Sequence, residues 1–237
     1  MYLGFPQLEL IVWALVIFAT AALIYRLLVS LVGADPTLAA SALYLVLLTI
    51  SQYAASKVTV YLWFGVPAGT ATYVATVAML DVVVMREGFG YARNLVFVGL
   101  ASQALITVAN EYVLSAPSIS APQGVYAYVF GVSARVALAS AVAYLAAELT
   151  DAYVVSKVGR AIWMRVLYSD PLAMAIDTLV FIPLAFYGVL PQAVLEGTMV
   201  GLLIAKWSLA PAVLGLVYVN RRYLFKDVYA INRGRFI

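Results

Sequence analysis

Residues 172–190 read LAMAIDTLVFIPLAFYGVL, an apolar stretch in which Asp177 is the only charged residue. About 20 residues of this kind are enough for an α-helix to cross the hydrocarbon core of a bilayer. The rest of the chain is similar, because its mean hydropathy is +1.01 and only 11% of its residues are charged, against about a quarter in a soluble domain. The sequence therefore predicts an all-α, polytopic membrane helix bundle, a multi-pass protein of the cell membrane surrounded by the lipid bilayer.

Apolar runs separated by proline, glycine and charged residues predict seven transmembrane helices. Their expected ranges are 7–32, 37–63, 68–85, 91–114, 124–158, 172–190 and 192–220. Residues 1–237 then form a single transmembrane domain, in which 37–220 is a six-helix core, 7–32 an added N-terminal helix and 221–237 a basic cytoplasmic tail. Proline lacks a backbone N–H and favours helix ends, which places these prolines at boundaries: Pro6, Pro36, Pro67, Pro117, Pro122, Pro171 and Pro191. The range 124–158 would be about 50 Å long as one helix, so it must tilt, break or project from the membrane.

The distribution of basic residues predicts the orientation, because lysine and arginine near helix ends remain cytoplasmic. They flank the third and fifth connections and crowd the C-terminus: Arg86, Arg93, Lys157, Arg160, Arg165, Arg221, Arg222, Lys226, Arg233 and Arg235. The alternate connections near 64–68, 115–123 and 190–192 carry none. We therefore expect the N-terminus outside and the C-terminus inside. The net charge of +3 follows from this topology, and no nucleic-acid partner is needed to explain it.

Several function classes are excluded by what the chain lacks. It has no cysteine and no histidine, which removes disulfides, thiolate chemistry and the usual zinc or haem ligands. It also has no G-x-x-x-x-G-K-[ST] loop, so it does not hydrolyse ATP by that route. We expect no catalytic residue, cofactor or metal site, and a protein that is not an enzyme. Energy must come from an ion gradient, a partner or the substrate's own gradient, and a homo-oligomer stays open.

Charged residues inside the predicted helices mark the candidate site. They are the carboxylates Asp81, Glu148, Asp151 and Asp177 and the cations Lys57, Arg135 and Lys206. An unpaired charge at the bilayer centre costs about 2.5–3.5 kcal/mol, so each needs a partner, a cavity or a ligand. In a structural interpretation the acids pair with the cations between helices. In a functional one the four acids and Lys206 line a substrate site, and Lys57 and Arg135 contribute mainly to assembly.

Two prolines fall inside helices, each close to one of these charges. Pro183 follows Asp177, and Pro211 follows Lys206 and Trp207. A missing N–H frees a backbone carbonyl, and broken helices in transporters commonly line the substrate site. An ordinary proline kink is the structural alternative.

Four sequence elements, in order, resemble the vitamin uptake transporter family, whose members include the queuosine-precursor transporters. Asp81-Val-Val-Val-Met-Arg-Glu-Gly88 with Ala92-Arg93 resembles D-x-x-x-x-x-x-G-x-x-x-A-R. The second element, Glu148-Leu-Thr-Asp151-Ala-Tyr-Val, resembles [QE]-x-x-D-x-Y-V. The third, Ile176-Asp177-Thr178 with Phe181 and Ala185-Phe186-Tyr187-Gly188, resembles I-D-[ST]…F…A-F-Y-G. The fourth is Lys206 with Tyr218, which matches a late K…Y pair. The chain departs from the pattern at Met85, where the family often has an acid, near Gln52, where it often has asparagine, and at Gly215, where it has proline.

The resemblance implies a six-helix core and uptake of a 7-deazapurine such as 7-cyano-7-deazaguanine. A carboxylate accepts the paired N–H groups of a guanine-like edge, and O6 needs a donor such as Lys206 or Gln52. Trp207 or a tyrosine would stack on the ring. We expect Asp177→Asn to abolish uptake while the protein still folds and inserts, because removing a buried charge eases insertion.

Other classes of function fit parts of the sequence. A retinal protein would share seven helices, an acid such as Asp81 and a lysine such as Lys206, but it would carry an aspartate where this chain has Leu202. An intramembrane aspartyl protease would carry G-x-G-D, whereas Gly88 and Gly90 follow Asp81. A structural or assembly membrane protein is the remaining alternative.

Overall fold

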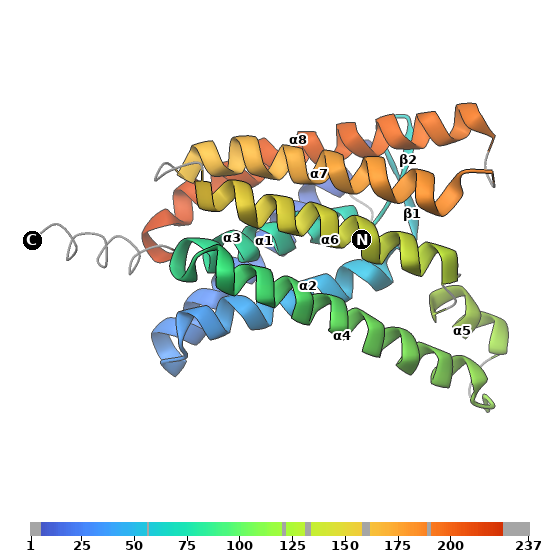
Figure 1. Cartoon of the computed structure of the whole chain (residues 1–237), viewed down its shortest axis with the longest axis horizontal. Coiled ribbons are helices and arrows are strands. Elements are labelled where there is room, and N and C mark those ends of the chain that lie inside the picture. Colours follow the sequence, from blue (N-terminus) through green and yellow to red (C-terminus); the bar gives the residue numbers. More distant parts are fainter. Residues whose placement is uncertain are drawn as a thin grey trace, which may run out of the picture.

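The computed structural model describes residues 6–55, 57–119, 122–130, 134–157, 162–188 and 191–224, with most of their side chains. Its elements in chain order are α1 (Pro6–Leu27), the π-helical turn η1 (Leu28–Val32), α2 (Pro36–Ala55), β1 (Val58–Tyr61), β2 (Phe64–Pro67), α3 (Thr70–Glu87), α4 (Phe89–Ser115), α5 (Gln123–Phe130), α6 (Ala134–Lys157), α7 (Ile162–Phe186) and α8 (Gln192–Leu224). Figure 1 shows the long helices running along a common direction as a bundle. The predicted polytopic helix bundle is thus confirmed.

Most helix bounds agree with the sequence-based ranges. α1 with η1 matches 7–32, and α3, α4 and α8 each begin within two residues of the expected start. α8 continues to Leu224, so the first residues of the expected tail are helical, and 225–237 lie outside the described residues. The range 124–158 breaks into α5 and α6, which is one of the three outcomes that its excessive length required.

The predicted helix over 37–63 is wrong in its last third. α2 ends at Ala55, and β1 pairs with β2 as an antiparallel hairpin with Val58 opposite Pro67. The two strands are rich in β-branched and aromatic residues, which favour strands over helices. Lys57 precedes β1 and is exposed, so it is not the buried helical cation that the sequence suggested.

The start of the predicted helix 172–190 is also wrong. α7 begins at Ile162, and Pro171 lies inside it together with Pro183. Interior prolines are tolerated in membrane helices, because neighbouring helices and local adjustments satisfy the freed carbonyls. Asp177 consequently lies nearer the middle of its helix than the sequence placed it.

α3 is the central helix of the bundle. All its residues from Thr70 to Val84 are buried, and it packs against α1, α2, α4, α6 and α8. The outer helices carry large apolar side chains on their exposed faces, such as Trp13, Leu38 and Leu105. This distribution suits a bundle whose outer surface faces lipid and whose polar groups are satisfied inside.

Five helices within the described part of the chain are long and apolar enough to cross a membrane. They span Glu9–Val32, Pro36–Ala55, Phe89–Ser115, Leu138–Lys157 and Tyr168–Phe186. The seven-helix prediction also requires α3 and α8 to cross the membrane, and it stays a prediction.

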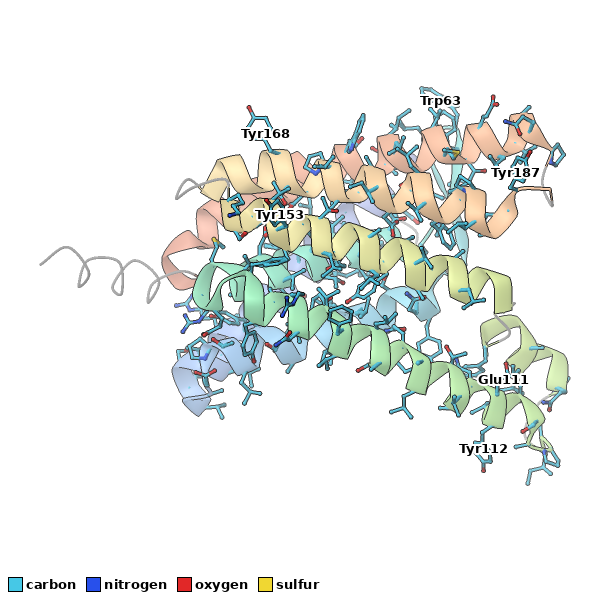
Figure 2. All side chains as sticks on the ribbon, in the orientation of Figure 1. Trp63, Glu111, Tyr112, Tyr153, Tyr168 and Tyr187 are labelled. Atoms are coloured by element: carbon cyan, nitrogen blue, oxygen red, sulfur yellow. The ribbon has the colours of Figure 1, made fainter. Side chains whose placement is uncertain are left out.

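The connections alternate between the two ends of the bundle (Figure 1). The α3–α4 connection and the C-terminal end of α6 lie at one end, and the β1–β2 hairpin and the start of α8 lie at the other. Figure 2 shows Trp63 of the hairpin, Tyr112 and Tyr187 toward this second end. They are 88%, 73% and 68% exposed, as aromatic residues at a membrane–water interface commonly are.

The orientation can be tested at two exposed positions at opposite ends, Trp63 and Lys157. Because the chain has no native cysteine, Trp63→Cys and Lys157→Cys each provide a single thiol. We expect an impermeant maleimide to label Trp63→Cys from outside intact cells and Lys157→Cys only after the membrane is opened. Labelling of both from the same side would contradict the seven-helix topology.

Candidate functional site

A cavity of about 90 Å³ opens between α2, α3, α6, α7 and α8, next to the end of the hairpin. Its lining combines polar and apolar side chains: Leu48, Ser51, Gln52, Ala55, Pro67, Gly69, Thr70, Tyr73, Ser140, Tyr144, Asp177, Phe181, Leu202 and Lys206. A pocket with apolar walls and a few convergent polar groups is typical of a site for a small molecule.

An ion pair between α7 and α8 provides the charges of this cavity. Lys206 Nζ contacts Asp177 Oδ2, and the two side chains are 4% and 19% exposed respectively. The ammonium group also lies 4.9 Å from the centroid of the Tyr73 ring, a cation–π distance. The pair is neutral as a whole, and the partial exposure of Asp177 leaves acceptor capacity on its carboxylate. The structure thus brings together two residues that the sequence singled out separately.

Gln52 supplies an amide to the lining of the cavity. Its Nε2 lies 3.3 Å from Ser140 Oγ, which links α2 to α6. The neighbouring Ser51 Oγ donates to the carbonyl of Gly69 over 3.3 Å. α2 and the start of α3 approach so closely here that a Cβ on Gly69 would overlap the Ser51 carbonyl oxygen and lie 3.0 Å from the Ala55 nitrogen.

A series of buried hydrogen bonds links Tyr144, at the cavity, to Glu148. The hydroxyl groups of Tyr44 and Tyr144 bond to each other, and Tyr44 donates to Glu148 Oε2 over 3.4 Å. Glu148 is fully buried, and its Oε1 has no hydrogen-bond partner. Tyr144 lines the cavity and Glu148 does not, so Tyr44 and Tyr144 form one link between Glu148 and the site.

A second acidic group is formed by three aspartates from α3, α6 and α7. One carboxylate oxygen from each of Asp81, Asp151 and Asp170 lies within 4.8 Å of the others, and all three residues are buried. Ser169 Oγ donates to Asp151 Oδ1 over 2.6 Å. None of the three aspartates lines the cavity, so the predicted site divides into two separate groups.

Asp170 is a residue that the sequence analysis missed. It precedes Pro171, which was placed at a helix boundary, so Asp170 was not counted among the charges inside helices. Tyr73, Tyr144 and Ser140 were also missed as cavity residues. The signal of Ser140 is a hydroxyl group within an otherwise apolar run, which is weak because serine hydroxyls commonly bond to their own helix. Tyr73 and Tyr144 are two of the chain's 17 tyrosines, and the sequence does not distinguish them from the others.

Trp207, another predicted site residue, lies away from the cavity. Trp207 is 49% exposed, and its Nε1 donates to the carbonyl of Pro171 over 3.1 Å, which links α8 to α7. It is not among the residues that line the cavity. The side chains of Arg135, Pro211 and Tyr218 lie outside the described ones.

Comparison with known proteins places the chain among transporters. A probable queuosine precursor transporter of Bacillus subtilis (strain 168) is 26% identical over 174 residues, which cover 69% of this chain and 76% of that protein. No solved structure matches the chain. Neither this relative nor the family match that follows supports the alternative of a retinal protein. The model of the family described as "Putative vitamin uptake transporter" matches residues 67–220. Since this match covers well over half of the chain, the protein belongs to the vitamin uptake transporter family and is a multi-pass membrane transporter.

Proposed function

We propose that this protein imports a queuosine precursor, a 7-deazapurine such as 7-cyano-7-deazaguanine, which binds in the cavity beside Asp177 and Lys206. The observation that carries the proposal is a partly buried, neutral ion pair at the wall of a cavity that also presents an amide and aromatic rings. The similarity to a protein named as a queuosine precursor transporter supports the same class of substrate.

The hydrogen-bonding groups of the ligand complement those of Asp177, Lys206 and Gln52. A guanine-like edge has a ring N–H beside an amino group, and an ionised carboxylate is an acceptor for both. Lys206 and Gln52 are donors for the ligand's O6. Because the ion pair is already neutral, a neutral ligand adds no uncompensated charge to the interior, where such a charge would be costly.

The remaining lining favours a flat ring. Tyr73, Tyr144 and Phe181 all line the cavity, and aromatic side chains provide large contact areas with few torsions to immobilise. Direct contact with substrate is therefore proposed for Asp177, Lys206 and Gln52. Glu148 acts through the tyrosines beside it, and Asp81, Asp151 and Trp207 do not line the cavity.

The proposal is tested by ligand-induced thermal stabilisation of the purified protein. We expect 7-cyano-7-deazaguanine and 7-deazaguanine to raise the Tm, and a 7-deazapurine without the 2-amino group to do so much less. Gln52→Leu should weaken binding about tenfold, the loss expected for one neutral hydrogen bond. Gln192→Leu is the matched control, because Gln192 bonds to exposed Glu196 and neither residue lines the cavity. Stabilisation by an unrelated vitamin and by none of the purines would contradict the proposal.

A further inference from the structure

The acidic group of Asp81, Asp151 and Asp170 joins three helices that are distant in the sequence. Asp81 belongs to α3, Asp151 to α6 and Asp170 to α7, and the three residues are 3%, 0% and 1% exposed. Asp170 precedes Asp177 by seven residues of α7, about 10 Å along a helix axis. The group therefore lies apart from the proposed substrate cavity.

Two of its oxygen atoms have unused bonding capacity. Asp151 Oδ2 and Asp170 Oδ1 are buried and have no hydrogen-bond partner in the described structure. Neither residue forms an ion pair with a lysine or arginine among the described side chains. Buried carboxylate oxygens without a partner are strongly disfavoured, so the arrangement points to a positively charged ligand.

The size and chemistry of the group fit a metal cation. Carboxylates are hard oxygen ligands, which bind cations such as Ca²⁺ and Mg²⁺. Two ligands of one ion cannot be farther apart than twice the metal–oxygen distance, which is about 4.6–5.2 Å for Ca²⁺ and about 4.1 Å for Mg²⁺. The limit of 4.8 Å on the three oxygens falls within the calcium range.

We propose that Asp81, Asp151 and Asp170 form a binding site for a hard metal cation between α3, α6 and α7. Ser169 positions Asp151 by donating to its Oδ1 and leaves Oδ2 for the cation. The site differs from the proposed purine site in residues, location and ligand, and it was not expected from the sequence.

The test measures cation binding by the purified, metal-stripped protein in a choline buffer. CaCl₂, MgCl₂ and NaCl are titrated separately, with equilibrium dialysis for stoichiometry and thermal unfolding for stability. We expect one ion per chain and, at about 100 times the Kd, a Tm higher by about 5–10 °C. Comparison of the three salts identifies the ion.

Variants assign the effect to the group. Asp170→Asn should lose most of the shift, and without cation it should be at least as stable as the wild type because a buried repulsion is removed. Asp151→Asn should behave in the same way. Glu111→Gln is the control, since Glu111 is exposed on α4 at the far end of the bundle (Figure 2), and it should keep the full shift.

Two results would overturn the proposal. One is a wild-type protein that neither binds nor is stabilised by any of the three cations, even if mild acid raises its Tm, because the carboxylates would then share protons. The other is an Asp170→Asn variant that keeps the full cation-induced shift. Both are read without a transport substrate, so they do not depend on the proposed import function.

Discussion

Asp177→Asn is expected to lower the free energy of unfolding by about 3–5 kcal/mol, because it leaves the buried Lys206 without a counter-charge, and Lys206→Met by somewhat less, because Asp177 is partly exposed. The double variant Asp177→Asn/Lys206→Met should recover most of this loss, since it removes both charges together. Thermal unfolding in detergent measures all three. This expectation replaces the one from sequence alone, in which Asp177→Asn was to ease insertion, because the structure pairs Asp177 with Lys206.

The double variant separates structure from ligand binding. If Asp177 and Lys206 contact the purine, the double variant is stable but does not bind 7-cyano-7-deazaguanine or take it up. A stable double variant that binds as tightly as the wild type would show that the pair only joins α7 to α8. Lys57→Met is the matched control for removal of a lysine. Because Lys57 is exposed at the hairpin, its effect should stay within about 0.5 kcal/mol.

Gly69→Ala is expected to be the most damaging substitution of a small residue. The added methyl group would overlap the Ser51 carbonyl oxygen, which is backbone and cannot move away without shifting α2. Overpacking of this kind costs about 1–3 kcal/mol. Because Ser51 and Gly69 both line the cavity, the shift should also weaken purine binding.

Gly90→Ala provides the comparison for this substitution. A Cβ at Gly90 meets nothing within 4 Å, and alanine is favoured over glycine in a helix by up to about 1 kcal/mol. Gly90→Ala should therefore leave stability unchanged or slightly raised. A Gly69→Ala variant as stable as Gly90→Ala, with unchanged purine affinity, would show that α2 and α3 separate at no cost.

The sequence predicted the class of the fold and most helix ends, because these depend on local properties. Apolar length alone identifies helices such as α1 and α4, and prolines such as Pro36 and Pro191 mark starts that the structure also has. The errors occurred where local signals compete. Pro171 is a boundary signal that α7 overrides, and the strand preference of Val58–Tyr61 ended α2 early.

The sequence by itself determined that this protein is a helical membrane bundle of the vitamin uptake transporter family, and that its buried charges need partners. Only the tertiary structure decided which partners these are. Asp177 meets Lys206 across 29 positions of the chain, whereas Asp81 and Asp151 join Asp170. Helical periodicity specifies the face on which a side chain lies, but not which helix packs against that face. That choice follows from the packing of whole helices around α3, and it separates one predicted acidic site into a cavity and a distinct carboxylate group.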